Sequence, residues 1–122
     1  MKLKDDFFKV KAFCKTETGM DFSVTFNPEH AIFKAHFPDN PITPGVCIIQ
    51  IIKELTEVIL ERELLLKKAK NIKFLNVINP LENKEVTFSI SISSENGIVH
   101  KISALVYSEN NNFAKLSLSF TA

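Results

Sequence analysis

Residues 36–50 read His36-Phe37-Pro38-Asp39-Asn40-Pro41-Ile42-Thr43-Pro44-Gly45-Val46-Cys47-Ile48-Ile49-Gln50. The first ten positions hold one histidine, three prolines and one glycine, and an apolar run follows directly. Proline fixes one backbone dihedral angle and has no amide N–H, so this segment predicts a stiff loop with few hydrogen-bond donors. Such a loop can hold a titratable ring and the first turn of a helix in fixed positions.

The pattern that follows predicts one long amphipathic helix from Pro44 to about Leu66. Proline is tolerated in the first turn, and Thr43 is the expected N-cap. At 100° per residue the apolar side chains share one broad face, made of Cys47, Ile48, Ile51, Ile52, Leu55, Val58 and Ile59. The opposite face carries Gln50, Lys53, Glu54, Glu57 and Glu61. A helix of ~20 residues is roughly 30 Å long.

Strict alternation of apolar and polar residues predicts antiparallel strands on both sides of this helix. The alternating segments are 21–26, 86–93 and 115–120. Further expected strands cover 7–14 and 97–108, whose two faces are both partly apolar, and 71–78, with turns at 17–19, 79–80, 95–97 and 109–112. Asn96-Gly97 is a typical hairpin turn. The order of elements predicts an α+β fold in which an antiparallel sheet wraps around the long helix, as a single domain over residues 1–122.

Composition excludes several classes of protein. The chain has 122 residues, 45% hydrophobic, with 15 basic and 14 acidic side chains and a net charge of +1. A dedicated binder of nucleic acid or of a membrane surface normally carries a basic excess, so neither is expected. The 11 phenylalanines suit a deep apolar core or an acyl pocket, because a phenyl ring needs no hydrogen-bond partner.

The cysteines, the N-terminal residues and the longest apolar stretch together predict a cytoplasmic protein. No metal or cofactor is expected. Cys14 and Cys47 have no metal-binding or redox spacing, so both are expected to be reduced core residues. Asp5 and Asp6 stand where a signal peptide would be apolar. The longest apolar stretch, residues 46–60, contains charged side chains, so no membrane span is expected.

The motif His-Phe-Pro-x-x-Pro-x-x-Pro-Gly-Val over residues 36–46, leading into the helix, resembles that of the hot-dog-fold 3-hydroxyacyl-[acyl carrier protein] dehydratases. Segments 28–35 and 72–80 are compatible with the same family. The resemblance implies a hot-dog fold and the dehydration of 3-hydroxyacyl thioesters to trans-2-enoyl thioesters in fatty-acid or related acyl-chain synthesis. The substrate would be linked to acyl carrier protein or CoA.

The same resemblance implies a homodimer, or a larger assembly of dimers, with active sites between two subunits. A strand over 71–78 would offer an edge for continuing the sheet across such a dimer. The family's histidine corresponds to His36 and its helix glutamate to position 50, which is Gln50 here. The family often has glutamine four residues later, where this chain has Glu54.

Elimination of water needs a base, an acid and a group that stabilises an enolate oxygen. His36 can act as the base because imidazole titrates near physiological pH. Gly45 and Val46 would offer unpaired N–H groups to the thioester carbonyl at the helix N-terminus. Phe37 and Pro44 are the other residues expected to contact the substrate.

The acid is less clearly defined, because an amide can orient a hydroxyl group but cannot donate a proton as a carboxylic acid does. Gln50 and Glu54, one turn apart, are therefore both candidate catalytic partners of His36. The alternative for Glu54 is a place in a solvated stripe on the helix. Cys47 could be a nucleophile at the helix N-terminus, but its position on the apolar face favours core packing.

Three functions remain open from the sequence. The first is the dehydratase, and the second is an acyl thioesterase that holds water against the carbonyl. The third is a catalytically impaired acyl-binding subunit of a heteromer. Lys67, Lys68, Lys70 and Lys73 either contact an acidic carrier protein or mark a solvated helix end, whereas His30 and His100 are interpreted as structural.

Overall fold

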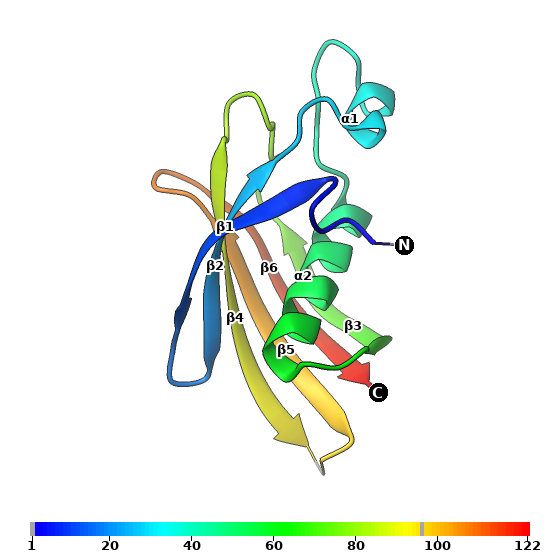
Figure 1. The fold of residues 1–122 in the computed structure, drawn as a ribbon, viewed down its shortest axis with the longest axis vertical. Helices are drawn as coiled ribbons and strands as arrows, with labels where there is room; N and C mark the ends of the chain where they lie inside the picture. Colours follow the sequence, from blue (N-terminus) through cyan, green and yellow to red (C-terminus); the bar gives the residue numbers. More distant parts are fainter. Residues whose placement is uncertain (1, 96) are drawn as a thin grey trace.

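A long helix lies across the concave face of a six-stranded antiparallel sheet in the computed structural model, which describes residues 2–95 and 97–122 (Figure 1). The elements are β1 (Phe8–Lys15), β2 (Gly19–Phe26), α1 (Ala31–Ala35), α2 (Gly45–Leu60), β3 (Leu65–Phe74), β4 (Glu85–Glu95), β5 (Val99–Tyr107) and β6 (Asn112–Thr121). The predicted α+β class and the order of two strands, a long helix and four strands are confirmed.

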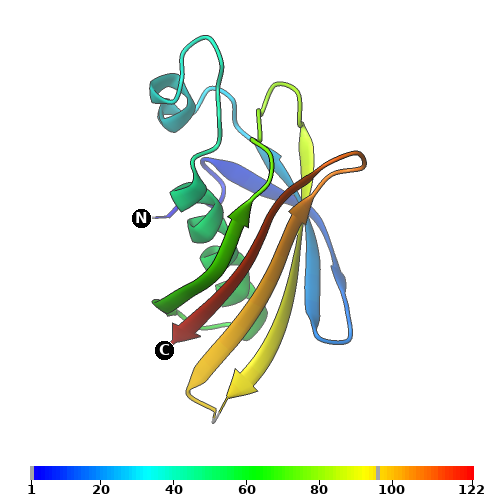
Figure 2. The ribbon, with the colours of Figure 1, turned by 180° about the vertical axis from the view of Figure 1, so that it is seen from behind.

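The sheet has the strand order β1-β2-β4-β5-β6-β3. Its two edges are therefore β1 and β3, which Figure 2 shows on opposite sides of the sheet. The predicted hairpin between β4 and β5 is present as an antiparallel pair, and Asn96 of its turn lies outside the described residues. Either edge strand has an outer side at which a further strand could pair.

The core lies between α2 and the sheet. Five residues of the predicted apolar helix face, Cys47, Ile48, Ile51, Ile52 and Leu55, are buried. From the sheet, alternate residues of β4, β5 and β6 meet them, among them Phe88, Val106 and Phe120, each fully buried. Burying a side chain of this size contributes roughly 1.5–3 kcal/mol, so this layer is the main source of stability.

Two boundaries differ from the prediction, because α2 ends at Leu60 and β3 covers 65–74 instead of 71–78. Glu61 adopts a left-handed backbone (φ 54°), which ends the helix. The carboxylate of Glu57 then accepts a hydrogen bond from the N–H of Leu64 at 2.9 Å and turns the chain. Pairing of β3 with β6 outweighs the helical pattern of the sequence here, because tertiary contacts override local propensity.

The short helix α1 was not predicted. The Nδ1 atom of His30 caps it by accepting the N–H of Ile32 at 3.0 Å, and Nε2 lies 3.2 Å from the carboxylate of Asp6. The ring of Phe33 stacks on that of Phe7 with centroids 4.6 Å apart. His30 is therefore structural, as expected, and these contacts join α1 to the N-terminal segment.

The two cysteines and His100 differ in their exposure to solvent. Cys14 is exposed on β1, so its assignment to the core was wrong, while Cys47 is buried and both thiols are free. His100 on β5 is buried, and neither ring nitrogen has a hydrogen-bond partner among the described residues. None of the described helices is long and apolar enough to span a membrane.

Candidate active site

His36 lies at the C-terminal end of α1, and both its backbone N–H and its carbonyl group are hydrogen-bonded. Its N–H donates to the carbonyl groups of Ile32 (3.0 Å) and Phe33 (3.2 Å), and its own carbonyl accepts the N–H of Ile42 at 2.8 Å. The imidazole ring is exposed, and the ring of Phe37 lies beside it with centroids 5.8 Å apart. The predicted stiff loop thus fixes the position of His36 and leaves its ring accessible.

The loop ends at the N-terminus of α2, which has no side-chain cap. Pro44, not the predicted Thr43, takes the N-cap position, and its carbonyl accepts the N–H groups of Cys47 and Ile48. The N–H groups of Gly45 and Val46 precede these first bonds of the helix and are available to a ligand. Thr43 is turned into the protein instead, where its hydroxyl is buried without a partner among the described residues.

Phe74 packs directly against this helix N-terminus, a contact that the sequence did not predict. A Cβ atom added to Gly45 would lie 2.8 Å from Cζ of the Phe74 ring. The absence of a side chain at Gly45 therefore makes room for the ring at the end of β3. Large apolar side chains are also exposed in the loop before α2, in its first turn and at and after the end of β3, namely Phe37, Val46, Phe74, Leu75 and Val77.

Gln50 and Glu54 form a hydrogen-bonded pair one turn apart on α2. The amide Nε2 of Gln50 donates to Oε2 of Glu54 at 2.9 Å. Glu54 also accepts the backbone N–H groups of Leu3 and Lys4, each at 2.8 Å, and is only 5% exposed. The interpretation of Glu54 as part of a solvated stripe was wrong, because the N-terminal segment covers this part of the helix.

A groove of about 770 Å³ runs beside this pair. Its lining residues include Gln50, Glu54 and Glu57 from α2 and Leu64 and Leu65 at the start of β3. His36, Phe37, Pro44, Gly45 and Val46 are not among the residues that line it. Within one chain, the loop candidates and the helix candidates therefore form two groups, of which the second borders a groove.

Nucleophilic catalysis by Cys47 is not supported. The residue is 3% exposed on the core side of α2, and burial raises the pKa of its thiol. A thiol in this state is a poor nucleophile at neutral pH. Among residues 2–95 and 97–122, no group of three or more histidine, cysteine or acidic residues could hold a metal ion.

The chain is similar to known proteins in sequence and in structure. A family model described as ApeI-like, ApeI dehydratase, matches residues 12–115. No curated protein sequence matches the chain significantly. One similar solved structure is the dehydratase heterocomplex ApeI:P from Xenorhabdus doucetiae, with a TM-score of 0.68, 15% identity, and coverage of 93% of this chain and 96% of that chain.

Two thioesterase structures are also similar. One is a mutant thioesterase from Pseudomonas aeruginosa, with a TM-score of 0.65, 10% identity, and coverage of 93% of this chain and 79% of that chain. The other is a hypothetical thioesterase with coenzyme A from Streptococcus pneumoniae, with a TM-score of 0.63, 9% identity, and coverage of 93% and 84%. At such identities the likeness shows the fold, and the predicted hot-dog fold is confirmed.

Proposed function

Because this chain belongs to the ApeI-like dehydratase family, we propose that it dehydrates 3-hydroxyacyl thioesters to trans-2-enoyl thioesters, with the acyl group held on an acyl carrier protein. The observation that carries the proposal is one loop with a reactive group at each end. An exposed imidazole on a fixed backbone, His36, begins the loop, and the uncapped N–H groups of Gly45 and Val46 end it.

The chemistry can be written on these groups. A ring nitrogen of His36 removes a proton from the carbon next to the thioester carbonyl, and the electron pair moves onto the carbonyl oxygen. The N–H groups of Gly45 and Val46, at the positive end of the helix dipole, stabilise that oxygen. The enolate then re-forms the carbonyl and expels the 3-hydroxyl group. Protonated His36 returns the proton, so the hydroxyl group leaves as water.

Gln50 is assigned the orientation of the 3-hydroxyl group. Its amide can donate a hydrogen bond to that oxygen but cannot supply the proton, which leaves both proton transfers to His36. Glu54 holds the amide of Gln50 in place through the 2.9 Å hydrogen bond and is therefore a positioning residue. Phe37 and Pro44 are assigned to the wall of the substrate site beside His36 and Gly45.

We assign His36 and Gln50 of each active site to different subunits of a homodimer. Exposed apolar side chains support a dimer across the β3 edge, because Leu65, Leu66, Leu75 and Val77 are 66%, 45%, 47% and 64% exposed. The outer edge of β3 also has unpaired backbone groups, which a second strand could satisfy. Such an arrangement would bring the loop of one copy to the Gln50 groove of the other.

A thioesterase is the second candidate, and the Gln50–Glu54 pair is the observation that favours it. An amide donor beside a carboxylate can hold a water molecule, with the carboxylate as the acceptor of its proton. Hydrolysis would then release a free thiol and a fatty acid, and no enoyl thioester would form. The two functions differ in their products.

The test uses the purified protein with a 3-hydroxyacyl thioester of the carrier protein. The wild type is expected to form the enoyl thioester without releasing free thiol, and His36→Ala is expected to lower the rate by about 10²–10⁴-fold. Release of thiol by the wild type would establish the thioesterase instead. Substrate binding without either product would identify a catalytically impaired subunit.

Gln50→Glu tests the role given to the amide. Two carboxylates at hydrogen-bond distance share one proton, so the pair with Glu54 would contain a carboxylic acid. We expect faster dehydration, because the acid would take over one of the two proton transfers from His36. A loss of activity would contradict this expectation and show that the amide donor itself is required.

A further inference from the structure

We propose that the outer face of strands β3 to β6 is the docking surface for the acidic carrier protein that presents the acyl thioester. This inference rests on the proposed function and names a partner surface for it. We call this surface the lysine face and define it by Lys68, Lys70, Lys73, Lys101 and Lys115.

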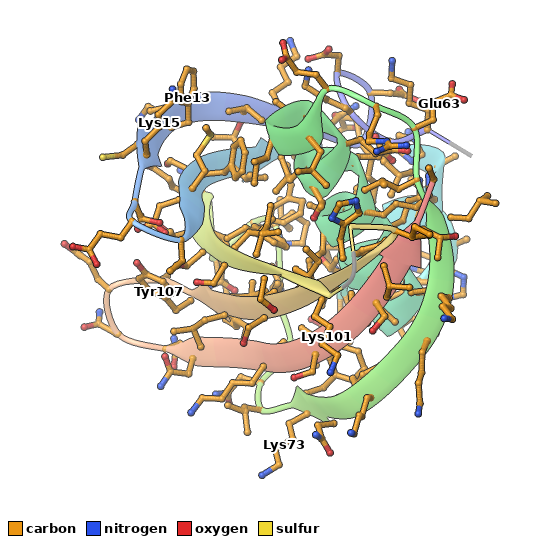
Figure 3. All side chains as sticks on the ribbon, turned by 90° about the horizontal axis from the view of Figure 1, so that it is seen from below. Phe13, Lys15, Glu63, Lys73, Lys101 and Tyr107 are labelled. Carbon is orange, nitrogen blue, oxygen red and sulfur yellow. The ribbon has the colours of Figure 1, made fainter. Side chains whose placement is uncertain are left out.

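The strand register places these lysines on one side of the sheet. Lys68 and Lys101 both lie opposite Ser119, Lys70 lies opposite Ser117, and Lys73 lies opposite Lys115. Directly opposed residues project from the same face of a sheet, and their neighbours along the strand project from the other face. The residues that alternate with these lysines on β5 and β6, such as Ile102 and Leu116, are buried on the side of the sheet that faces α2. The side chains of Lys101 and Lys73 point away from the helix (Figure 3).

Two adjoining grooves run along this face, of about 730 and 490 Å³. They share Asn71, Ser91, Ser103 and Ser117 and therefore form one continuous depression. Lysine and serine side chains dominate the lining, which contains Lys67, Lys68, Lys70 and Lys101 in the larger groove and Lys73 and Lys115 in the smaller one.

Among the described residues, no aspartate or glutamate lines either groove. The lysines are concentrated on β3, β5 and β6, while Asp21 and Glu85 lie on the same side of the sheet over β2 and β4. Ammonium groups and serine hydroxyls together suit a ligand with several carboxylates.

The same lining argues against a single-stranded nucleic acid as the ligand. In the part of the chain that the structure describes, no aromatic side chain lines either groove, whereas single-stranded nucleic acids are bound by aromatic stacking as well as by charge. An acidic protein surface fits the combination of charge, hydroxyl groups and grooves.

The lysine face also adjoins the proposed active site. Lys73 is followed directly by Phe74, whose ring contacts Gly45 at the N-terminus of α2 on the other side of β3. A carrier protein bound near Lys73 would therefore stand at the C-terminal end of β3. Its flexible arm would have to pass this end of the strand, because the outer edge of β3 is occupied in the proposed dimer.

The experiment compares two variants of equal charge. Lys70→Glu/Lys115→Glu changes the lysine face, and Lys9→Glu/Lys84→Glu changes exposed lysines outside it. Each variant is assayed with a 3-hydroxyacyl group on the carrier protein and on N-acetylcysteamine, which is too small to reach the lysine face from the active site. Thermal unfolding of both variants verifies that they fold.

The lysine-face variant is expected to raise KM for the carrier substrate by about tenfold, more at low salt, with unchanged turnover of the N-acetylcysteamine thioester. The control variant should behave as the wild type with both substrates. Equal losses on both substrates, or an unchanged KM for the carrier substrate, would overturn the docking proposal and leave the dehydratase assignment standing.

Direct binding separates the two proposals further. Fluorescence anisotropy with labelled carrier protein that holds no acyl group should show salt-dependent binding to the wild type and to the control variant, and much weaker binding to the lysine-face variant. This result supports the docking surface even if no dehydration is found. Binding of phosphatidylglycerol vesicles through the same lysines, with no carrier binding, would overturn the proposal in favour of a membrane surface.

Discussion

Glu54 shows how a single side chain on α2 can serve the fold and the active site together. Its carboxylate accepts hydrogen bonds from Leu3, Lys4 and Gln50, so it holds the N-terminal segment against the helix and also fixes the amide of Gln50. A buried carboxylate is costly unless its oxygen atoms are satisfied, and these three donors meet that requirement. Removal of Glu54 should therefore affect stability as well as catalysis.

Glu54→Ala is expected to lower the free energy of unfolding by about 1–3 kcal/mol, because backbone N–H groups lose their acceptor. Glu54→Gln should lose less, since its amide oxygen can still accept. Thermal or urea unfolding measures both, with Glu63→Ala, an exposed residue, as the control. A wild-type melting temperature for Glu54→Ala would show that the N-terminal segment is not held by this carboxylate.

The two cysteines should differ in reactivity. Burial raises the pKa of the Cys47 thiol, so little of it is ionised at neutral pH, while Cys14 is exposed. Iodoacetamide is expected to label Cys14 quickly, and to label Cys47 only when the protein unfolds or the pH is high. Peptide mass spectrometry after timed labelling gives the two rates. Equal rates in the folded protein would contradict the burial of Cys47.

At the scale of the elements, the contact between β3 and α2 connects the edge of the sheet to the thioester site. Phe74 ends β3 and packs on Gly45, so the position of the strand determines what surrounds the helix N-terminus. A displacement of the ring would alter the space available to the substrate without removing any buried core contact.

Gly45→Ala tests this contact. The added Cβ would lie 2.8 Å from Cζ of Phe74, which must turn away. Phe74 is half exposed, so the free energy of unfolding should change by less than about 1 kcal/mol. We expect kcat/KM to fall by about tenfold, because the substrate loses its alignment. Gly45→Ala/Phe74→Leu should recover part of the activity, and unchanged activity of the single variant would refute a role for this contact.

The pairing of β1, β2 and β4 includes a carboxylate whose ionised form is favoured. Hydrogen bonds from Ser23 and Lys11, and the charge of Lys11, lower the pKa of Glu85. A lowered pKa stabilises the fold above the ordinary value of 4.5, and this contribution is lost as the pH falls below it. Glu85→Gln should therefore melt slightly below the wild type at pH 7 and together with it in acid. A difference that persists in acid would show that ionisation of Glu85 is not its cause.

At the scale of the whole molecule, the single chain leaves its two groups of candidate residues apart. His36 lies outside the groove beside Gln50 and Glu54, while apolar side chains along and after β3 are exposed. In our proposal, a dimer across this edge buries them and completes the site. The opposite edge, β1, presents the exposed Phe13, which provides a matched control.

Val77→Glu is expected to shift the protein from dimer to monomer, because the interface would have to bury an unpaired charge. Sedimentation velocity over a range of concentrations measures the shift. Phe13→Glu changes a side chain of equal exposure, 64%, at the other edge and should leave the dimer intact. Dissociation by Phe13→Glu alone would place the interface at β1.

The pattern of residues was sufficient to predict most of the fold. Alternation located β2, β4 and β6, and the apolar face from Cys47 to Leu55 predicted the buried side of α2, because these local periods match the geometry of strand and helix. The motif at residues 36–46 identified the family. The roles of His36, Gly45 and Val46 stay predictions, since neither the family match nor the similar structures test them.

Only the tertiary structure decided the ends of α2 and β3, the burial of Glu54, and the contact between Phe74 and Gly45. Residues 65 and 66 suit a helix locally but pair with β6 instead. Glu54 lies on the polar face of its helix but is covered by Leu3 and Lys4. Each of these outcomes depends on partners far away in the sequence. Local propensity amounts to a few tenths of a kcal/mol per residue, whereas strand pairing and burial contribute several, so the distant partners prevail.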